Sequence, residues 1–127
     1  MSGNVDQGVV RPASAVTAKS VAAGTATEMQ VLVGTTEGAP NFVMRRFIMG
    51  EQGGMPMHTN RVEHEQYVLR GKARVTIAGI THDVGPDDTL FIPAGTPHCY
   101  EVVQAPFEFL CIVPNAPDEI RLVEGQG

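Results

Sequence analysis

Three of the four histidines in the chain are spaced so that they could bind a metal ion together. Neutral imidazole binds Zn, Cu, Fe or Ni well, provided that several rings converge from a rigid frame. His58 and His64 lie six residues apart, and His98 follows in a later segment. Spacing alone leaves a second interpretation open, in which scattered histidines cap strands or form hydrogen bonds with neighbours. The fourth histidine, His82, falls beside Asp83 in an expected hairpin, and we expect it to be exposed.

The segment that leads to His98 favours the metal interpretation. It reads DDTLFIPAGTPH, which is a short strand, a turn of the Pro-x-Gly type and a histidine directly after a second proline. Because proline fixes φ, this turn holds the backbone tightly and directs His98 inward at the start of the next strand. Tyr100 lies two residues further along, on the same face of that strand. Its hydroxyl could donate a proton or a hydrogen bond, which makes Tyr100 a candidate catalytic residue, with a plain core position as the alternative.

The polar segment around the first two histidines supplies two more candidates. Side chains two apart on a strand share a face, so Asn60 could point the same way as His58, and Gln66 the same way as His64. The amide oxygen of Asn60 is a weak, neutral ligand for a divalent ion, and a hydrogen bond to the ligands is its alternative role. Gln66 is the second candidate catalytic residue, because it could orient a ligand or bind substrate.

These side chains need a rigid frame, and the pattern of the chain predicts an all-β one. The 14 Gly and 9 Pro residues interrupt the chain every few positions, and short runs rich in Val, Ile, Phe and Met lie between them. Residues Lys72 to Ile77 alternate between polar and apolar, as in a half-buried strand. Many short strands without helical periods between them predict a sandwich or a barrel. Further strands are expected in MQVLVG, NFVMRRFIMG, EQYVLRG, TLFIP, HCYEVV and FEFLCIVP, with AGIT and HDVGPDD as connections.

The length of 127 residues suits one domain with a real core. We expect residues 28–127 to form the barrel and residues 1–27 to form a tail and arm. The first eight residues are expected to be frayed, and the rest of this arm to be an edge strand or to pack on the barrel. If the strands close, apolar side chains should line a pocket, with about half of the candidates pointing inward. These candidates are Phe47, Met49, Tyr67, Val75, Ile77, Phe91, Tyr100, Phe107, Phe109 and Cys111.

Charge and cysteine usage exclude some partners. The net charge of −5 makes nucleic acid an unexpected partner, and the basic group Arg70, Lys72 and Arg74 is expected on a solvated strand face. No run is long enough for a transmembrane helix and no secretory signal is visible, so we expect no membrane partner and a cytoplasmic location. Cys99 and Cys111 lie in apolar runs, where a buried free thiol is usual, with a single bridge left open. No basic residue stands next to Cys111 in the sequence, which predicts packing rather than a nucleophilic role.

The two histidine segments together resemble the two sequence motifs of the cupin family. The first motif runs from Gly through His-x-His to Glu and a second Gly, and GGMPMHTNRVEHEQYVLRG follows it with His58 at the first histidine. Asn60 stands in place of the second histidine, and His64 stands in place of the glutamate. The second motif ends in Pro-x-Gly-x-x-His, which PAGTPH matches, while Asp87 occupies the place of its leading Gly. The resemblance covers roughly residues 29–115.

The resemblance implies a single-domain cupin fold, which is a double-stranded β-helix or jelly-roll barrel. It implies one divalent transition metal ion at His58, His64 and His98, with Asn60 as a further ligand or a hydrogen-bond partner. A subgroup of small cupins with an all-histidine site typically holds manganese, so Mn or Fe is favoured, and Ni, Cu or Zn stays an option. Three protein ligands leave coordination positions on the ion open for a small substrate. Because these ligands are neutral, the charge of the ion is not compensated, which favours an anionic substrate. Because cupins commonly pair through sheet edges, a homodimer is expected.

Three functions remain as hypotheses. The first is an oxygenase that binds a small organic substrate at the open metal positions and cleaves a carbon–carbon bond with dioxygen. The second uses the ion as a Lewis acid for isomerisation, decarboxylation or lyase chemistry. The third is a non-catalytic module that binds a small ligand and keeps a structural metal. The sequence identifies neither the substrate nor the reaction, because one fold hosts many reactions.

Overall fold

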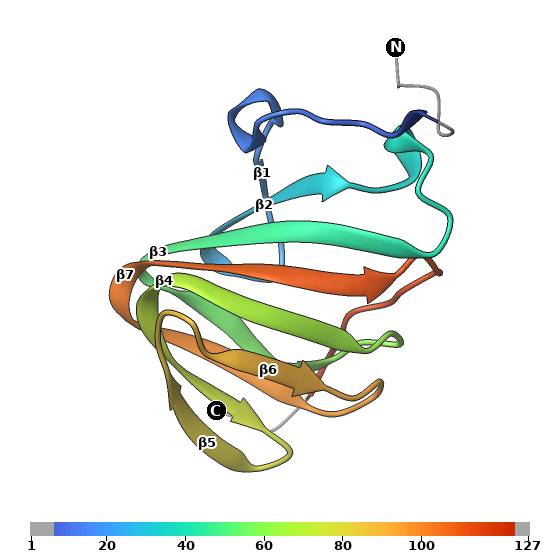
Figure 1. Ribbon diagram of the computed structural model, residues 1–127. Coiled ribbons are helices and arrows are strands. Elements are labelled where there is room, and N and C mark those ends of the chain that lie inside the picture. Colours follow the sequence, from blue (N-terminus) through green and yellow to red (C-terminus); the bar gives the residue numbers. More distant parts are fainter. Residues whose placement is uncertain (1–6, 124–127) are drawn as a thin grey trace.

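The computed structural model describes residues 7–123 and is built almost entirely from antiparallel strands (Figure 1). One sheet runs in the order β1-β2-β3-β7-β4-β5, while β6 pairs with β4 and β8 pairs with β3. The expected all-β jelly-roll barrel is confirmed. Most of the tail that we expect to be frayed lies outside the described residues. The strands are β1 (Lys19–Ser20), β2 (Thr25–Val33), β3 (Phe42–Thr59), β4 (His64–Ile77), β5 (Ile80–Val84), β6 (Thr89–Ile92), β7 (His98–Pro114) and β8 (Arg121–Leu122).

Three long strands, β3, β4 and β7, wrap around the barrel and contribute to both of its layers (Figure 1). β3 pairs with β7 in two stretches, with a register shift between Met49 and Gly54. Such irregularities bend a strand and increase its twist, which lets one strand continue from one layer into the other. The prediction of two separate strands on either side of Gly71 is wrong, because an irregularity of the same kind joins them into one strand. Gly71 lies inside β4, next to register shifts against β7, and adopts φ +79°, which a glycine takes without steric cost.

The core lies between the layers and follows the period of two expected for strands. Along β4, the buried side chains of His64, Gln66 and Val68 alternate with exposed neighbours. Each fully buried large apolar side chain contributes roughly 1.5–3 kcal/mol to stability. The largest fully buried apolar side chains are Met49, Val68, Val75, Ile92, Phe107, Phe109 and Cys111.

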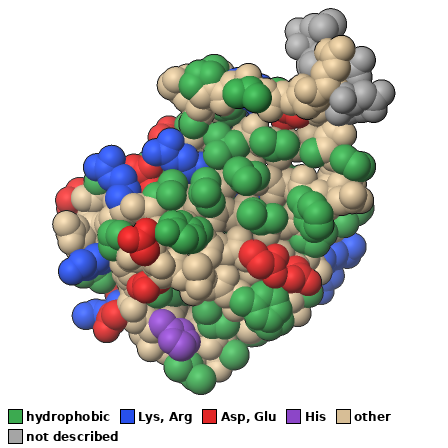
Figure 2. Space-filling view, viewed as in Figure 1, with side chains coloured by type: hydrophobic (Ala, Val, Ile, Leu, Met, Phe, Trp, Pro, Cys, Tyr) green, Lys and Arg blue, Asp and Glu red, His purple; other side chains and the backbone are tan. Residues whose placement is uncertain are grey.

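Charged side chains gather on the outer surface of the barrel. Arg74 extends outward from β4 toward Asp83 at 3.5 Å and Glu101 at 3.8 Å, and Lys72 is exposed on the same strand. Figure 2 shows one face with Lys and Arg side chains along its left edge and again at its right edge, and with acidic side chains nearby. The expectation that Arg70 shares this solvated face is confirmed, since its side chain is 62% exposed.

Both ends of the described chain fold back onto the barrel. β1 pairs with β2, and the side-chain amide of Gln30 on β2 donates to the carbonyls of Ala13 and Val16 at 3.0 and 2.8 Å. The arm therefore both packs on the barrel and adds an edge strand. At the other end, β8 pairs with the last residues of β3. Within residues 7–123, no helix is long and apolar enough to cross a membrane.

The hairpin after β4 differs in detail from the prediction. The chain turns at Ala78 and Gly79, inside the segment AGIT that we expect to connect two strands. The next expected connection, HDVGPDD, is partly wrong, because its first three residues complete β5. His82 is exposed on this strand, as predicted.

Candidate functional site

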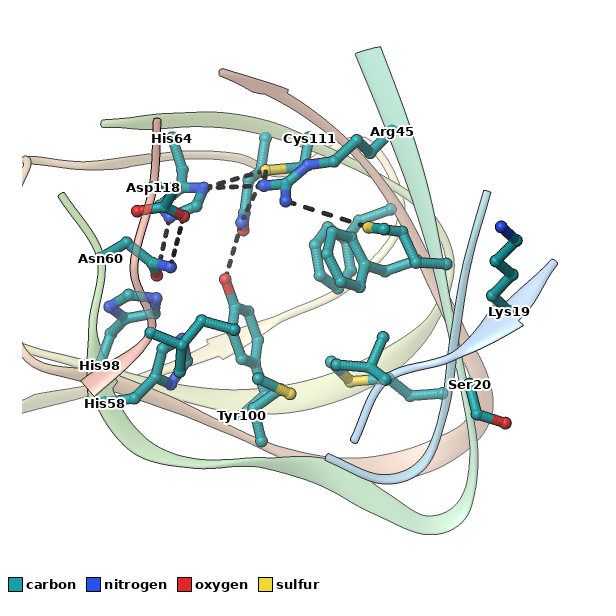
Figure 3. Close-up of a pocket in the computed structure, with 18 residues that line it drawn as sticks. Lys19, Ser20, Arg45, His58, Asn60, His64, His98, Tyr100, Cys111 and Asp118 are labelled. Atoms are coloured by element: carbon teal, nitrogen blue, oxygen red, sulfur yellow. Dashed lines mark hydrogen bonds between the residues drawn. The ribbon is translucent and has the colours of Figure 1, made fainter. Parts of the chain in front are cut away.

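A cavity of about 200 Å³ opens inside the barrel, with histidines at one end and the strand β1 at the other (Figure 3). Most of its wall is apolar, as is usual for a pocket that takes a small organic molecule. The apolar candidates Tyr67 and Phe91 do not reach it. They point outward, 43% and 57% exposed, because each lies on the outer face of its strand. The apolar and aromatic side chains that do line the cavity include Met29, Phe47, Met49, Met55, Tyr100 and Phe109.

His58 and His98 form the centre of the polar end. They are register partners on β3 and β7, and their ring centroids lie 4.2 Å apart. Nδ1 of His58 lies 2.8 Å from the carbonyl oxygen of Pro56, and Nδ1 of His98 lies 2.9 Å from that of Thr96. A carbonyl oxygen only accepts, so Nδ1 carries the proton in both rings and each Nε2 keeps a lone pair. This is the hydrogen bonding that typically orients histidines as metal ligands.

His64 is placed beside this pair but is bonded differently. It begins β4, and its ring centroid lies 5.5 Å from that of His98. Its Nε2 lies 3.0 Å from Oδ1 of Asn60, whose Nδ2 donates to Oδ2 of Asp118 at 2.9 Å. Because a carboxylate only accepts, Asp118 fixes the orientation of the amide and turns its oxygen toward His64. In this arrangement His64 donates from Nε2 to Asn60.

Burial keeps all three imidazoles neutral near pH 7. It lowers the pKa of His58, lowers that of His98 to about 4, and, together with the positive charge of Arg45, lowers that of His64 to about 3. Burial opposes ionisation of Asp118, but hydrogen bonds from the backbone and from Asn60 outweigh it and lower the pKa of that carboxyl. The polar end therefore presents neutral nitrogen donors beside one carboxylate.

The donor set fits a transition metal ion with one change at His64. In residues 7–123 as they lie, no three His, Cys, Asp or Glu side chains form a group that could hold an ion. His58 and His98 nevertheless have lone pairs ready at Nε2. His64 Nε2 and Asn60 Oδ1 lie 3.0 Å apart. Two ligand atoms that bind one ion at right angles to each other, with bonds of ~2.1 Å, have about this separation. His64 could join such a set once its proton moves from Nε2 to Nδ1, where Cys111 Sγ would accept it and the hydrogen bond from Arg45 Nη2 to that nitrogen would be given up.

Arg45 and Cys111 complete the site; Cys111 is among the residues expected to line the pocket, whereas Arg45 is not. Arg45 Nη2 lies 3.3 Å from His64 Nδ1 and 3.2 Å from Cys111 Sγ, and His64 Nδ1 itself lies 3.2 Å from Cys111 Sγ. Cys111 has no basic neighbour along the chain, but the fold brings the guanidinium of Arg45 against its sulfur. A signal existed for Arg45, because it shares the inward face of β3 with Phe47 and Met49. Both cysteines are free, so the bridge left open in the sequence is not formed.

Gln66 and Tyr100 both face the cavity, on the strand faces that alternation predicts. Gln66 Nε2 donates to Tyr100 Oη at 2.7 Å, and both side chains are buried. Burial raises the pKa of Tyr100 well above its usual value, so the phenol stays protonated. Because its oxygen accepts from Gln66, its own proton is available for donation into the cavity.

Fold and site together define a small jelly-roll barrel with a ligand cavity that ends in imidazoles. The family model described as Cupin domain matches residues 45–113, and the chain belongs to this family. The polyketide cyclase RemF from Streptomyces resistomycificus is similar in structure, with a TM-score of 0.83 and 31% identity over 91% of this chain and 84% of that one. A cupin-2 domain protein from Rhodospirillum rubrum shares the fold, with a TM-score of 0.79 and 21% identity over 93% of this chain and 82% of the other.

Curated relatives match over a shorter segment. Mannose-1-phosphate guanylyltransferase ManC from Salmonella typhimurium is 42% identical over 52 residues, which are 41% of this chain. The matched segment makes up 11% of that protein, so the chain corresponds to a small part of it. The corresponding enzyme from Escherichia coli is 40% identical over 52 residues, again 11% of its length.

Proposed function

We propose that this cupin is a metal-dependent enzyme that closes a ring in, or rearranges, a small unsaturated ketone without an oxidant. The observation that carries the proposal is the similarity to a polyketide cyclase over 91% of the chain, combined with an apolar cavity that ends in imidazoles. Ring closure of a poly-β-ketone joins an enolate carbon to a ketone carbon and releases water. It consumes neither dioxygen nor a redox cofactor. This is the non-oxidative class among the functions expected from the sequence.

His58, His98 and Asn60 would hold one divalent ion, with His64 joining them, and Mn or Fe is the ion that the family resemblance favours. Bound there, the ion supplies Lewis acidity toward a ketone or enolate oxygen. The hydrogen bonds from Nδ1 of His58 and His98 to backbone carbonyls support this role, because they keep both rings in one tautomer and one orientation.

The remaining residues of the cavity position the substrate and handle a proton. Phe47 and Phe109 stack with their centroids 5.1 Å apart, and Tyr100 stacks on Phe109 at 5.3 Å. These stacked rings give the cavity an apolar, aromatic wall for the substrate. The Tyr100 hydroxyl donates a hydrogen bond to the substrate oxygen, held in place by Gln66. An oxygenase reaction and a non-catalytic binding role stay predictions for the same cavity.

The metal is tested by elemental analysis of purified protein. We expect close to one ion per chain in the wild type after loading, and in His82→Ala, which removes an exposed histidine from β5. We expect His58→Ala and His98→Ala to retain little metal while they keep the far-ultraviolet circular dichroism of the wild type. A wild-type protein without near-stoichiometric metal after reloading would overturn the proposal.

The reaction class is tested separately, with loaded protein and an aromatic poly-β-ketone under strict exclusion of air. We expect a product smaller than the substrate by one water, seen by mass spectrometry, and a slower reaction with Tyr100→Phe. A reaction that starts only when air is admitted would favour the oxygenase instead. Binding without turnover under both conditions would favour the non-catalytic role.

A further inference from the structure

Arg45 places a positive charge inside the cavity, away from the His58–His98 pair (Figure 3). Its side chain is half-buried, and its guanidinium carbon lies 5.1 Å from the centroid of the Phe47 ring. Its Nη2 contacts the sulfur of Cys111 at 3.2 Å and Nδ1 of His64 at 3.3 Å, and its Nη1 contacts the sulfur of Met29 at 3.9 Å. The guanidinium thus lies against the Phe47 ring on one side and against uncharged sulfur and nitrogen atoms on the other.

No anion balances this charge within the described chain. Arg45 forms no ion pair with any carboxylate of residues 7–123, and its Nε is buried without a hydrogen-bond partner there. Arg46, the next residue, also has a buried Nε without a described partner, but it points to the other face of β3 and its charge is paired with buried Glu108, so the missing counter-ion is what sets Arg45 apart. A half-buried, always charged group without a counter-ion is costly, and an anion that enters the cavity would relieve that cost.

We infer that Arg45 binds a negatively charged oxygen of a planar aromatic or enolic ligand, so that the substrate of this cupin is an anion. The inference deepens the proposed function and rests on it, because both use the same cavity. A guanidinium offers paired N–H donors that match a carboxylate or a pair of enolate oxygens. The stacked rings of Phe47 and Phe109 would contact the planar part of the ligand from one side. Its other end would extend toward His58 and His98, where the proposed reaction takes place.

Binding of benzoate and of its neutral analogue benzamide tests this inference. Both probes have the same shape, and calorimetry on the purified protein gives their dissociation constants. Hydrogen bonds to a charged group are stronger than neutral ones by an amount that corresponds to about tenfold in affinity or more. We therefore expect the wild type to bind benzoate at least about tenfold more tightly than benzamide. We expect Arg45→Met to lose this preference and Arg45→Lys to keep part of it.

Two controls separate this inference from the proposed metal site and from damage to the fold. Arg74→Gln removes an exposed arginine from the outer face of β4 and should bind both probes as the wild type does. The preference for benzoate should persist in His98→Ala, even though that variant loses metal. Loss of the preference in His98→Ala, with its retention in Arg45→Met, would place the anion at the histidines and overturn the inference. A wild type that binds both probes equally, or neither, overturns it without any variant.

Discussion

Asn60 donates a hydrogen bond from Nδ2 to Oδ2 of Asp118 over 2.9 Å, which joins the loop after β3 to the segment before β8. The same carboxylate accepts from the backbone N–H of Arg61 at 2.7 Å. Asp118 therefore sets which end of the Asn60 amide faces the histidines. The oxygen end faces them, and that is the only end of an amide that can bind a cation.

Removing the Asp118 carboxylate should weaken metal binding without removing any ligand. In Asp118→Ala the amide of Asn60 can rotate, and its oxygen is no longer directed toward His64. Loss of such an orienting partner typically costs about 10–100-fold in metal affinity. Titration of the metal-free protein with Mn²⁺ or Zn²⁺ measures the change. Glu119→Ala is the matched control, since Glu119 pairs with Arg61 on the surface, and equal affinities of the two variants would contradict the role given to Asp118.

Acid should destabilise the metal-free protein in a window set by the histidines. Burial lowers the pKa of His98 to about 4 and that of His64 to about 3, from the ordinary value of 6.5. At a pH between the lowered pKa of each ring and 6.5, that histidine binds a proton in the unfolded chain but not in the folded protein. The free energy of unfolding therefore falls as the pH drops below 6.5, by up to about 1.4 kcal/mol per pH unit for each histidine. Above pH 6.5 both rings are neutral in both states, and they contribute no slope.

Urea unfolding between pH 7.5 and 4.5 measures this dependence. The stabilising charge of Asp118 is lost only at lower pH, because the pKa of its carboxyl lies below 3.8. His98→Gln should flatten the curve, whereas His82→Gln, on exposed β5, should leave it unchanged. A slope that both variants share with the wild type would show that the buried histidines are not its cause.

The predictable part of the site is the part controlled by local geometry. The alternation of side chains places Gln66 on the face of His64 and Tyr100 on the face of His98, as expected from the sequence. Asp118 could not be found this way, because it reaches Asn60 across 58 residues from a segment without periodicity. Only the closure of the whole barrel brings the two together.

The full length of the long strands could not be predicted, because each contains a bulge or a register shift. A glycine within a strand pattern indicates either an end or a bulge, and the pattern around Gly71 predicts an end. The structure has a bulge there, since register shifts follow Val68 and Arg70 against β7. Which alternative applies depends on the partner strand, whose register a single sequence does not reveal.

The two cysteines should differ in their reaction with a thiol reagent. Cys111 is 0% exposed and lies among Arg45, His64 and Gln66, whereas Cys99 is partly exposed. Because modification needs access to the sulfur, iodoacetamide should label Cys99 first, and mass spectrometry of the labelled peptides gives both rates. The unfolded protein should show similar rates for both. Faster labelling of Cys111 in the folded protein would mean that contact with basic neighbours outweighs its burial, which would point to a reactive thiol.

Gly71 should tolerate no side chain, because the bulge in β4 brings the backbone of β7 against it. A Cβ at this position would lie 2.1 Å from the carbonyl oxygen of Pro106 and 2.7 Å from that of Gln104. Gly79 has a similar backbone, with φ +82° against +79°, but no described atom lies within 4 Å of the place that its Cβ would take. In Gly79→Ala only the unfavourable φ acts, which costs about 1 kcal/mol. Gly71→Ala adds a clash with backbone that cannot move aside, so its loss of stability in urea should be larger by about 1–3 kcal/mol. Equal losses in the two variants would mean that β4 and β7 separate easily at the bulge.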